Sequence, residues 1–229
     1  MKQPHLIIGL VMTAIGLIFF SVGLIFWFSS PGLYQELEQI EALPLLSAVQ
    51  LADTRPGVEA TIEGRAAERN ELFDQGFVAY ISRAYAGERC DTDDDGRRDC
   101  EPIWHERERI TPALWLDSGG GRVRLANSNY AVENPPASWQ STEGLRSNET
   151  YRLEGFKIND PVFAIGRVVA TDLGPALHAS LIFGGTRQTY LHNKQSEADS
   201  IYRGSLVFTG VGGLLLLIGG AFLLFKVFR

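Results

Sequence analysis

The stretch LIIGLVMTAIGLIFFSVGLIFWF, residues Leu6–Phe28, decides the fold of this chain. It carries no charge, and an apolar helix of about 20 residues crosses the ~30 Å hydrocarbon core of a bilayer. A second uncharged run, Ser205–Phe225, ends before Lys226 and Arg229. The sequence therefore predicts two membrane spans, with the first in segment 1–28, a soluble domain at 29–204, and the second span with a short tail in 205–229.

The first run differs from a secretory signal peptide in length and in its exit. Signal cores hold about 7–15 apolar residues and end at a small-residue cleavage site. This run is longer and ends with Phe26, Trp27 and Phe28. Aromatic residues anchor helices at the membrane interface. We therefore expect a retained membrane helix.

Glycines recur at intervals of seven residues in both runs, which would give each helix a shallow face for close packing. They are Gly9, Gly16 and Gly23 in the first run, and Gly212, Gly213, Gly219 and Gly220 in the second. These faces suit packing of the two helices on each other, on a membrane-protein partner or in a homo-oligomer. Glycine is also common in membrane helices generally, so a role in packing stays open here.

Two spans place both termini on one side of the bilayer, together with Lys2, Lys226 and Arg229. Cytoplasmic flanks of membrane helices are enriched in Lys and Arg, so we expect cytoplasmic termini and an outward-facing domain. The predicted location is a bacterial inner membrane with a periplasmic domain. In a eukaryote the domain would face an organelle's intermembrane or luminal space.

The soluble segment is acidic. Three of the 21 Lys and Arg residues lie near the termini, which leaves 18 against 27 Asp and Glu residues and a net charge of −9. This balance excludes nucleic acid and anionic membrane surfaces as principal partners, because both attract basic proteins.

The pattern of the soluble segment changes from helical to alternating at Val58. We expect short juxtamembrane helices at Tyr34–Ala42 and Gln188–Tyr202, which would hold the domain close to the bilayer at both ends. The predicted strands between them are Val58–Arg65, Phe77–Tyr85, Trp104–Ile110, Ala113–Asp117, Arg122–Ala126, Thr150–Phe156, Val162–Ala170 and Leu177–Phe183. Short strands separated by turns predict a mainly β soluble domain, a small OB-like barrel or a sandwich, inserted between two transmembrane α-helices.

One acidic loop resembles a calcium-binding turn. The possible ligands of a structural calcium ion are the carboxylates of Asp91, Asp93, Asp95 and Asp99 and the carbonyl of Arg97, with Gly96 at the tight turn. The twelfth position, usually a bidentate Glu in an EF-hand, is Pro102, and Glu101 comes one residue early. The loop is closer to the DxDxDG turns of thrombospondin type 3 repeats, and a solvated acidic turn is the alternative.

The only two cysteines, Cys90 and Cys100, bracket this loop. In an outward-facing compartment their spacing favours a disulfide. A reduced pair, or a metal site that includes His105, remains the alternative.

No nucleophile elbow, HExxH motif, Walker loop or paired-carboxylate motif occurs in the sequence. The segment Trp104–Arg109 combines histidine with charged residues, but in a regular strand His105, Arg107 and Arg109 would share one face, opposite Trp104, Glu106 and Glu108. We therefore read it as a charged ribbon and expect no enzymatic activity. A membrane-bound hydrolase is the most distant alternative.

Several of these segments together resemble the beside-a-membrane domain, also called the GIDE domain. They are Val58–Arg65, Phe77–Tyr80, Trp104, Ala113–Asp117 with its following glycines, and Val162–Gly166. That domain lies between two transmembrane helices in mitochondrial ubiquitin ligase activator proteins and in prokaryotic relatives. The resemblance implies a membrane-proximal domain with a sensing or binding role.

The eukaryotic ligases carry a RING finger after the second span, and this sequence has none. We therefore expect no ubiquitin transfer. The sequence favours a non-enzymatic accessory subunit or scaffold that binds partner proteins. The alternative is a stand-alone membrane sensor that binds a ligand or calcium.

Overall fold

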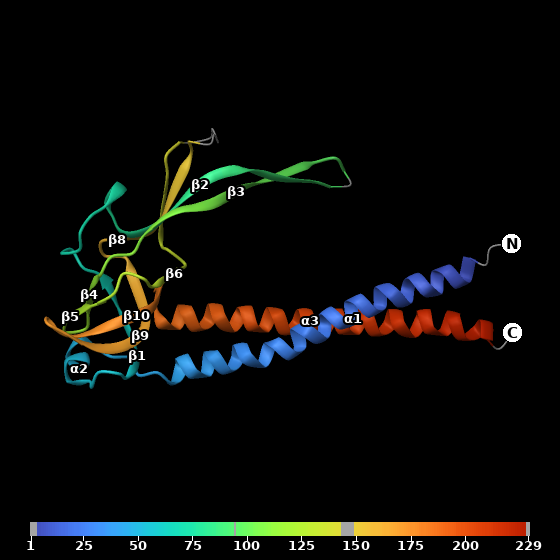
Figure 1. Cartoon of the computed structure of the whole chain (residues 1–229), viewed down its shortest axis with the longest axis horizontal. Coiled ribbons are helices and arrows are strands. Elements are labelled where there is room, and N and C mark those ends of the chain that lie inside the picture. Colours follow the sequence, from blue (N-terminus) through green and yellow to red (C-terminus); the bar gives the residue numbers. More distant parts are fainter. Residues whose placement is uncertain (1–3, 94, 143–148, 228–229) are drawn as a thin grey trace. The chain divides into compact units, whose positions relative to one another are not determined.

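The computed structural model describes residues 4–93, 95–142 and 149–227 (Figure 1). The helices and strands, in chain order, are α1 (Pro4–Ala42), α2 (Ala48–Asp53), β1 (Glu59–Ala66), a 3-10 turn (Asp74–Gly76), β2 (Phe77–Thr92), β3 (Arg98–Ile110), β4 (Trp115–Ser118), β5 (Gly121–Arg124), β6 (Ala131–Glu133), β7 (Ala137–Gln140), β8 (Tyr151–Lys157), β9 (Pro161–Thr171), β10 (Gly174–Gly184) and α3 (Arg187–Val227).

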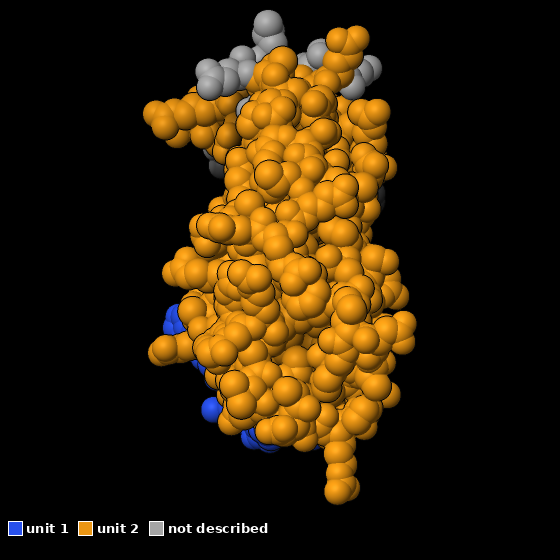
Figure 2. Space-filling model, turned by 90° about the vertical axis from the view of Figure 1, so that its left-hand side faces the viewer, with its two compact units in different colours: residues 1–42, 191–229 blue, residues 43–190 orange. Residues whose placement is uncertain are grey.

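The chain divides into two compact units, which are coloured separately in Figure 2. Residues 1–42 and 191–229 form the helical unit, which contains α1 and most of α3. Residues 43–190 form the β domain.

Both long helices are long and apolar enough to cross a membrane, as the sequence predicts. Each also extends beyond its apolar run. The 39-residue α1 continues to Ala42, 14 residues after Phe28, which adds about 21 Å of helix. The 41-residue α3 begins at Arg187, well before Ser205. Both predicted juxtamembrane segments, Tyr34–Ala42 and Gln188–Tyr202, are helical. Each is part of one continuous helix with its span, so neither is a short helix of its own.

The first helix passes through Pro31 without ending. Proline has no N–H and leaves the carbonyl four residues earlier without its helical partner. Here that carbonyl belongs to Trp27, and the Ser30 hydroxyl donates a hydrogen bond of 2.9 Å to it. A neighbouring side chain thus replaces the missing backbone donor.

The β domain contains two sheets. The larger sheet has the order β5-β4-β1-β9-β10-β6, and the smaller has the order β3-β2-β8-β7. All pairings are antiparallel except that of β6 with β10. The predicted mainly β class is confirmed. The strands of the described residues form two sheets and no closed barrel, so the OB-like barrel does not appear in the structure.

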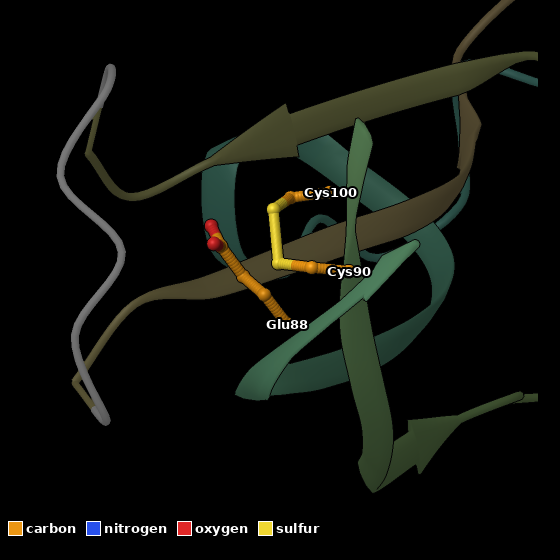
Figure 3. Close-up of side chains that lie close together, drawn as sticks. All are labelled: Glu88, Cys90 and Cys100. Atoms are coloured by element: carbon orange, nitrogen blue, oxygen red, sulfur yellow. A yellow bond between two sulfur atoms is a disulfide. The ribbon is translucent and has the colours of Figure 1, made fainter. Parts of the chain in front are cut away.

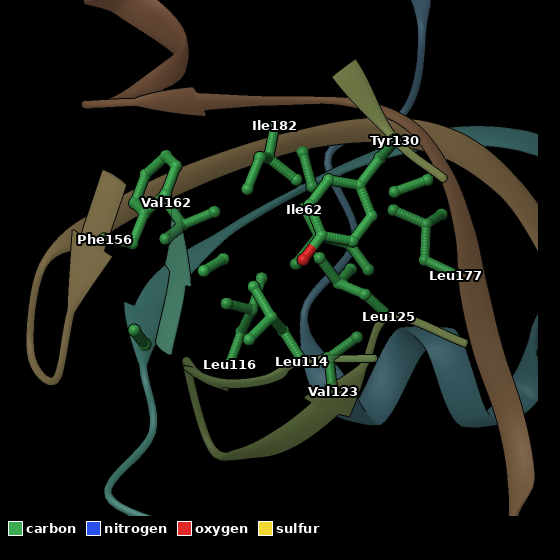
Figure 4. Packing of buried hydrophobic residues seen from close by; sticks show 14 of the residues in the cluster. Ile62, Leu114, Leu116, Val123, Leu125, Tyr130, Phe156, Val162, Leu177 and Ile182 are labelled. Atoms are coloured by element: carbon green, nitrogen blue, oxygen red, sulfur yellow. The ribbon is translucent and has the colours of Figure 1, made fainter. Parts of the chain in front are cut away.

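One main core fills the domain (Figure 4). It draws Ile62 from β1, Leu116 from β4, Phe156 from β8 and Ile182 from β10, and each of these side chains is fully buried. Tyr130 lies within this core, and its hydroxyl donates a hydrogen bond of 2.7 Å to the Pro112 carbonyl. A smaller cluster around Phe77, Tyr80 and Leu153 belongs to the smaller sheet.

Candidate functional site

Small residues recur every seven positions along the buried faces of α1 and α3. They are Gly9, Gly16, Gly23 and Ser30 on α1, and Ala198, Ser205, Gly212 and Gly219 on α3. We call these eight residues the seam. A seven-residue repeat keeps one face of each helix toward its partner along a left-handed crossing.

The helices approach closely along the seam. A Cβ atom built on Gly16 would lie 3.1 Å from the Gly212 carbonyl oxygen, and one built on Gly9 would lie 3.3 Å from the Gly219 oxygen. Gly213 and Gly220 differ, because a Cβ on either would meet nothing within 4 Å. The glycines of the second span therefore belong to two faces, and only one of them packs on α1.

The seam continues beyond the apolar runs. Ser30 and Ala198, in the extensions, are buried to the same degree as the glycines. Nearby, the Tyr34 hydroxyl donates a hydrogen bond of 2.8 Å to Asp199. Sequence reasoning found the glycines and missed Ser30, Ala198 and Ser205, although the same interval of seven, extended to serine and alanine, would have identified them.

The hairpin of β2 and β3 extends past the rest of the β domain (Figure 1). Ile81 and Ser82 are buried, but none of the described residues from Arg83 to Ile110 is. We call residues 83–108 the arm. Strand β3 is also an edge strand, and its charges and Pro102, which has no N–H to donate, disfavour pairing with a further strand.

A disulfide between Cys90 and Cys100 closes the outer part of the arm, with an S–S distance of 2.10 Å (Figure 3). The two cysteines are directly opposite each other in the β2–β3 ladder. The Glu88 carboxylate lies beside the sulfur atoms. Since both sulfurs are in the disulfide, this group offers a metal only one carboxylate.

The acidic loop forms a tight hairpin turn. The Gly96 N–H donates to the Asp93 carbonyl at 3.0 Å, and Gly96 has φ +76, in the left-handed region that favours glycine. The Asp93 carboxylate accepts the Arg97 N–H at 2.7 Å, and the Arg97 carbonyl accepts the Asp93 N–H at 2.9 Å.

Two of the proposed calcium ligands are therefore already used as hydrogen-bond acceptors. Asp91 and Asp99 face each other across the ladder, and Asp95 lies in the turn. In the part of the chain that the structure describes, these four carboxylates form no cluster of potential metal ligands. Calcium binding stays a prediction.

A cluster of arginine and aromatic side chains lies at the base of the arm, where the arm meets the end of β3 and strand β8. It consists of Arg83, Tyr85, Trp104, Glu106, Arg109, Arg152 and Glu154, and we call it the arginine patch. Arg152 lies over the Trp104 ring, 4.6 Å from its centroid, and Trp104 packs edge-on against Tyr85 at 5.8 Å.

A β-bulge decides the composition of this patch. The register of β3 against β2 shifts so that Arg83 is opposite Glu106 and Ile81 is opposite Arg109. Glu106 and Arg109 therefore share a face and form a two-pronged ion pair at 3.0 and 2.9 Å. These hydrogen bonds, with the charge of Arg83, lower the pKa of Glu106. The predicted alternation, with Arg109 on the opposite face from Glu106, is wrong for this reason.

A second candidate site lies at the start of α3. The Glu63 carboxylate accepts the Arg187 N–H at 3.0 Å, and the Arg187 guanidinium donates to the Leu43 carbonyl at 3.1 Å. Glu63 also lines an open cleft of about 590 Å³, together with Leu46, Ser47, Arg65, Asp117 and Pro161. A ligand in this cleft would contact the residue that holds the first turn of α3.

Neither a protein-family model nor a curated protein matches this chain.

Proposed function

We propose that this protein is a non-enzymatic accessory subunit or scaffold of a membrane complex, and that its arm binds a partner protein. The observation that carries the proposal is the arm itself. It is a disulfide-closed ribbon whose described residues from Arg83 onward are all at least partly exposed. The disulfide restricts the conformations of the ribbon, and a restricted element loses less conformational entropy when it binds.

The composition of the arm supports this reading. Protein interfaces are enriched in Trp, Tyr and Arg, and these residues dominate binding energies. At the base of the arm, the arginine patch presents Tyr85 and Trp104 together with Arg83, Arg109 and Arg152. Catalysis would require a nucleophile or an acid–base pair, whereas the glutamates of this cluster are held in ion pairs.

We place the β domain in the periplasm of a bacterium, on the charge asymmetry around the spans and on the disulfide, which persists in oxidising compartments. The beside-a-membrane resemblance agrees with a domain inserted between two spans. Gly213 and Gly220, which face away from α1, are the positions at which we propose that a partner span or a second copy packs.

Site-specific photocrosslinking tests the role of the arm. A photoreactive amino acid replaces Glu101 on the arm in one variant and Leu173 in the β9–β10 turn in the control, since both positions are exposed. We expect one discrete protein adduct from position 101 and none from position 173. No adduct from the arm, or equal adducts from both positions, would contradict the proposal.

A stand-alone sensor is the second candidate, and the Glu63–Arg187 contact favours it. A ligand in the adjoining cleft would act on the start of α3. Thermal melting of the full chain with single amino acids and with calcium tests this function. A sensor predicts a ligand-dependent shift. Glu63→Gln removes the shift if an amino acid binds in the cleft, and Asp91→Asn with Asp99→Asn removes it if calcium binds at the acidic loop. A subunit predicts no shift.

A further inference from the structure

The arginine patch continues the face of the smaller sheet that packs into the main core. Ala79 and Ile81 are buried on this face, and the next residues of β2 with the same orientation are Arg83 and Tyr85. The side chains of Arg83 and Arg152 are 36% and 31% exposed. The patch therefore lies on the smaller sheet and is partly exposed to solvent.

Hydrogen-bond donors in the patch outnumber acceptors. Glu106 is occupied by the two-pronged contact with Arg109. Glu154 alone serves both other arginines, at 3.1 Å from Arg83 Nε and 2.9 Å from Arg152 Nε. The Nε groups of Arg83 and Arg152 and the indole N–H of Trp104 are buried, and within the described residues none has a well-oriented acceptor.

The cross-strand register makes this excess of donors costly. Arg83 is directly opposite Arg152 in the β2–β8 ladder, and like charges in directly opposite positions destabilise a sheet. Among the described residues of the patch, three guanidinium groups face two carboxylates, so positive charge exceeds negative charge by one. A further carboxylate between Arg83 and Arg152 would supply the missing negative charge.

The patch is also preorganised for such a ligand. The Arg152 guanidinium rests on the Trp104 ring, and Trp104 is supported by Tyr85. Stacking fixes the plane of the guanidinium, so little side-chain entropy is lost when it binds. A planar, fixed guanidinium matches the two oxygens of a carboxylate.

We infer that the arginine patch binds a carboxylate side chain in an acidic peptide segment of a partner protein, between Arg83 and Arg152. This inference rests on the proposed function, because it names the chemistry of the partner that the arm receives. A single unmatched positive charge is too small for nucleic acid, which requires many cationic contacts.

The test uses the full chain in detergent micelles and a labelled peptide of eight residues that alternates Glu with Gly. Fluorescence anisotropy measures its binding, with a Gln–Gly peptide as the matched control. We expect the Glu peptide to bind about tenfold or more tightly than the Gln peptide, since hydrogen bonds to charged groups are the stronger ones. Equal binding of the two peptides, or no binding of either at millimolar concentration, would overturn the inference.

Free anions and three variants identify the site. Inorganic phosphate that displaces the peptide as well as an unlabelled Glu peptide does would mark a general anion site and overturn the peptide assignment. We expect Arg83→Gln with Arg152→Gln to weaken binding about tenfold or more, and Arg152→Lys to weaken it less. Arg122→Gln, at an exposed ion pair in the other sheet, should leave it unchanged.

The failure of this inference can be told apart from failure of the proposed function. If Arg83→Gln with Arg152→Gln keeps its melting temperature, loses no peptide affinity and still gives the adduct from position 101, the arm binds a partner by other contacts. If the wild-type chain binds the Glu peptide but gives no adduct, the patch is an anion site and the arm is not a docking element.

Discussion

Alanine at Gly212 and at Gly213 should have opposite effects, although the two positions are adjacent. A Cβ at Gly212 would lie 2.8 Å from Phe20 Cα and 2.9 Å from the Gly16 carbonyl oxygen, while one at Gly213 meets nothing within 4 Å. Ordinary van der Waals contact begins at 3.4 Å, and the Phe20 nitrogen is nearer to this Cβ than either of these atoms. Gly212→Ala must therefore separate the helices by about 1 Å against fixed backbone atoms.

Overpacking of this kind costs about 1–3 kcal/mol. At Gly213 the same change removes a flexible residue from a helix, which is neutral or stabilises by up to about 1 kcal/mol. We therefore expect the two variants to differ by about 1–4 kcal/mol in the free energy of unfolding.

The assay is unfolding in mixed micelles by increasing amounts of SDS, followed by far-UV circular dichroism. Gly219→Ala and Gly220→Ala repeat the comparison, because a Cβ at Gly219 would lie 2.8 Å from Thr13 N and one at Gly220 meets nothing. Equal midpoints within each pair, or a larger loss at Gly213 or Gly220, would refute the seam as the contact between α1 and α3.

Three further predictions concern the β domain. Tyr130→Phe leaves the Pro112 carbonyl buried without its donor and should cost about 1–3 kcal/mol in chemical denaturation. Burial raises the pKa of Tyr130, so its contribution to stability is complete below pH ~10 and declines progressively as the pH rises above that value. Unchanged stability at both neutral and alkaline pH would argue against this. Alkylation without reductant should leave the mass of the protein unchanged, and labelling of both thiols in the untreated protein would rule out the disulfide. Cys90→Ser with Cys100→Ser should speed amide exchange at the arm's tip. The melting of the core should change little, because the tip is exposed. If the loop binds calcium, titration calorimetry should show heat of binding with a dissociation constant of about 0.1–1 mM. Asp91→Asn with Asp99→Asn should abolish this heat. The absence of heat, together with no effect of chelator on melting, would end the calcium hypothesis.

Local patterns in the sequence account for much of the fold. The alternation over Val58–Arg65 corresponds to β1, and the apolar runs correspond to the two long helices. The sequence does not predict strands β6 and β7, because they are only three and four residues long. β6 lies just before the stretch 134–148, which is rich in Pro, Ser and Asn, and β7 lies within it. Both strands depend on pairing with distant strands. The continuity of α1 through Pro31 was also hidden, since it depends on a side chain that replaces a backbone donor.

The candidate site was less accessible to sequence reasoning. The spacing of Cys90 and Cys100 predicts the disulfide seen in the structure. The arginine patch joins residues of β2, β3 and β8, and its composition depends on a bulge at Arg107 that reverses the facing of Arg109. A strict period of two cannot reveal such a shift, because one extra residue moves every following side chain to the other face.

The most direct test of the account is the native mass and composition of the tagged protein extracted in mild detergent. We predict one stable species that contains this chain and a different protein at fixed stoichiometry. A lone monomer or a homo-oligomer, found while the protein remains folded, would contradict the role as an accessory subunit or scaffold.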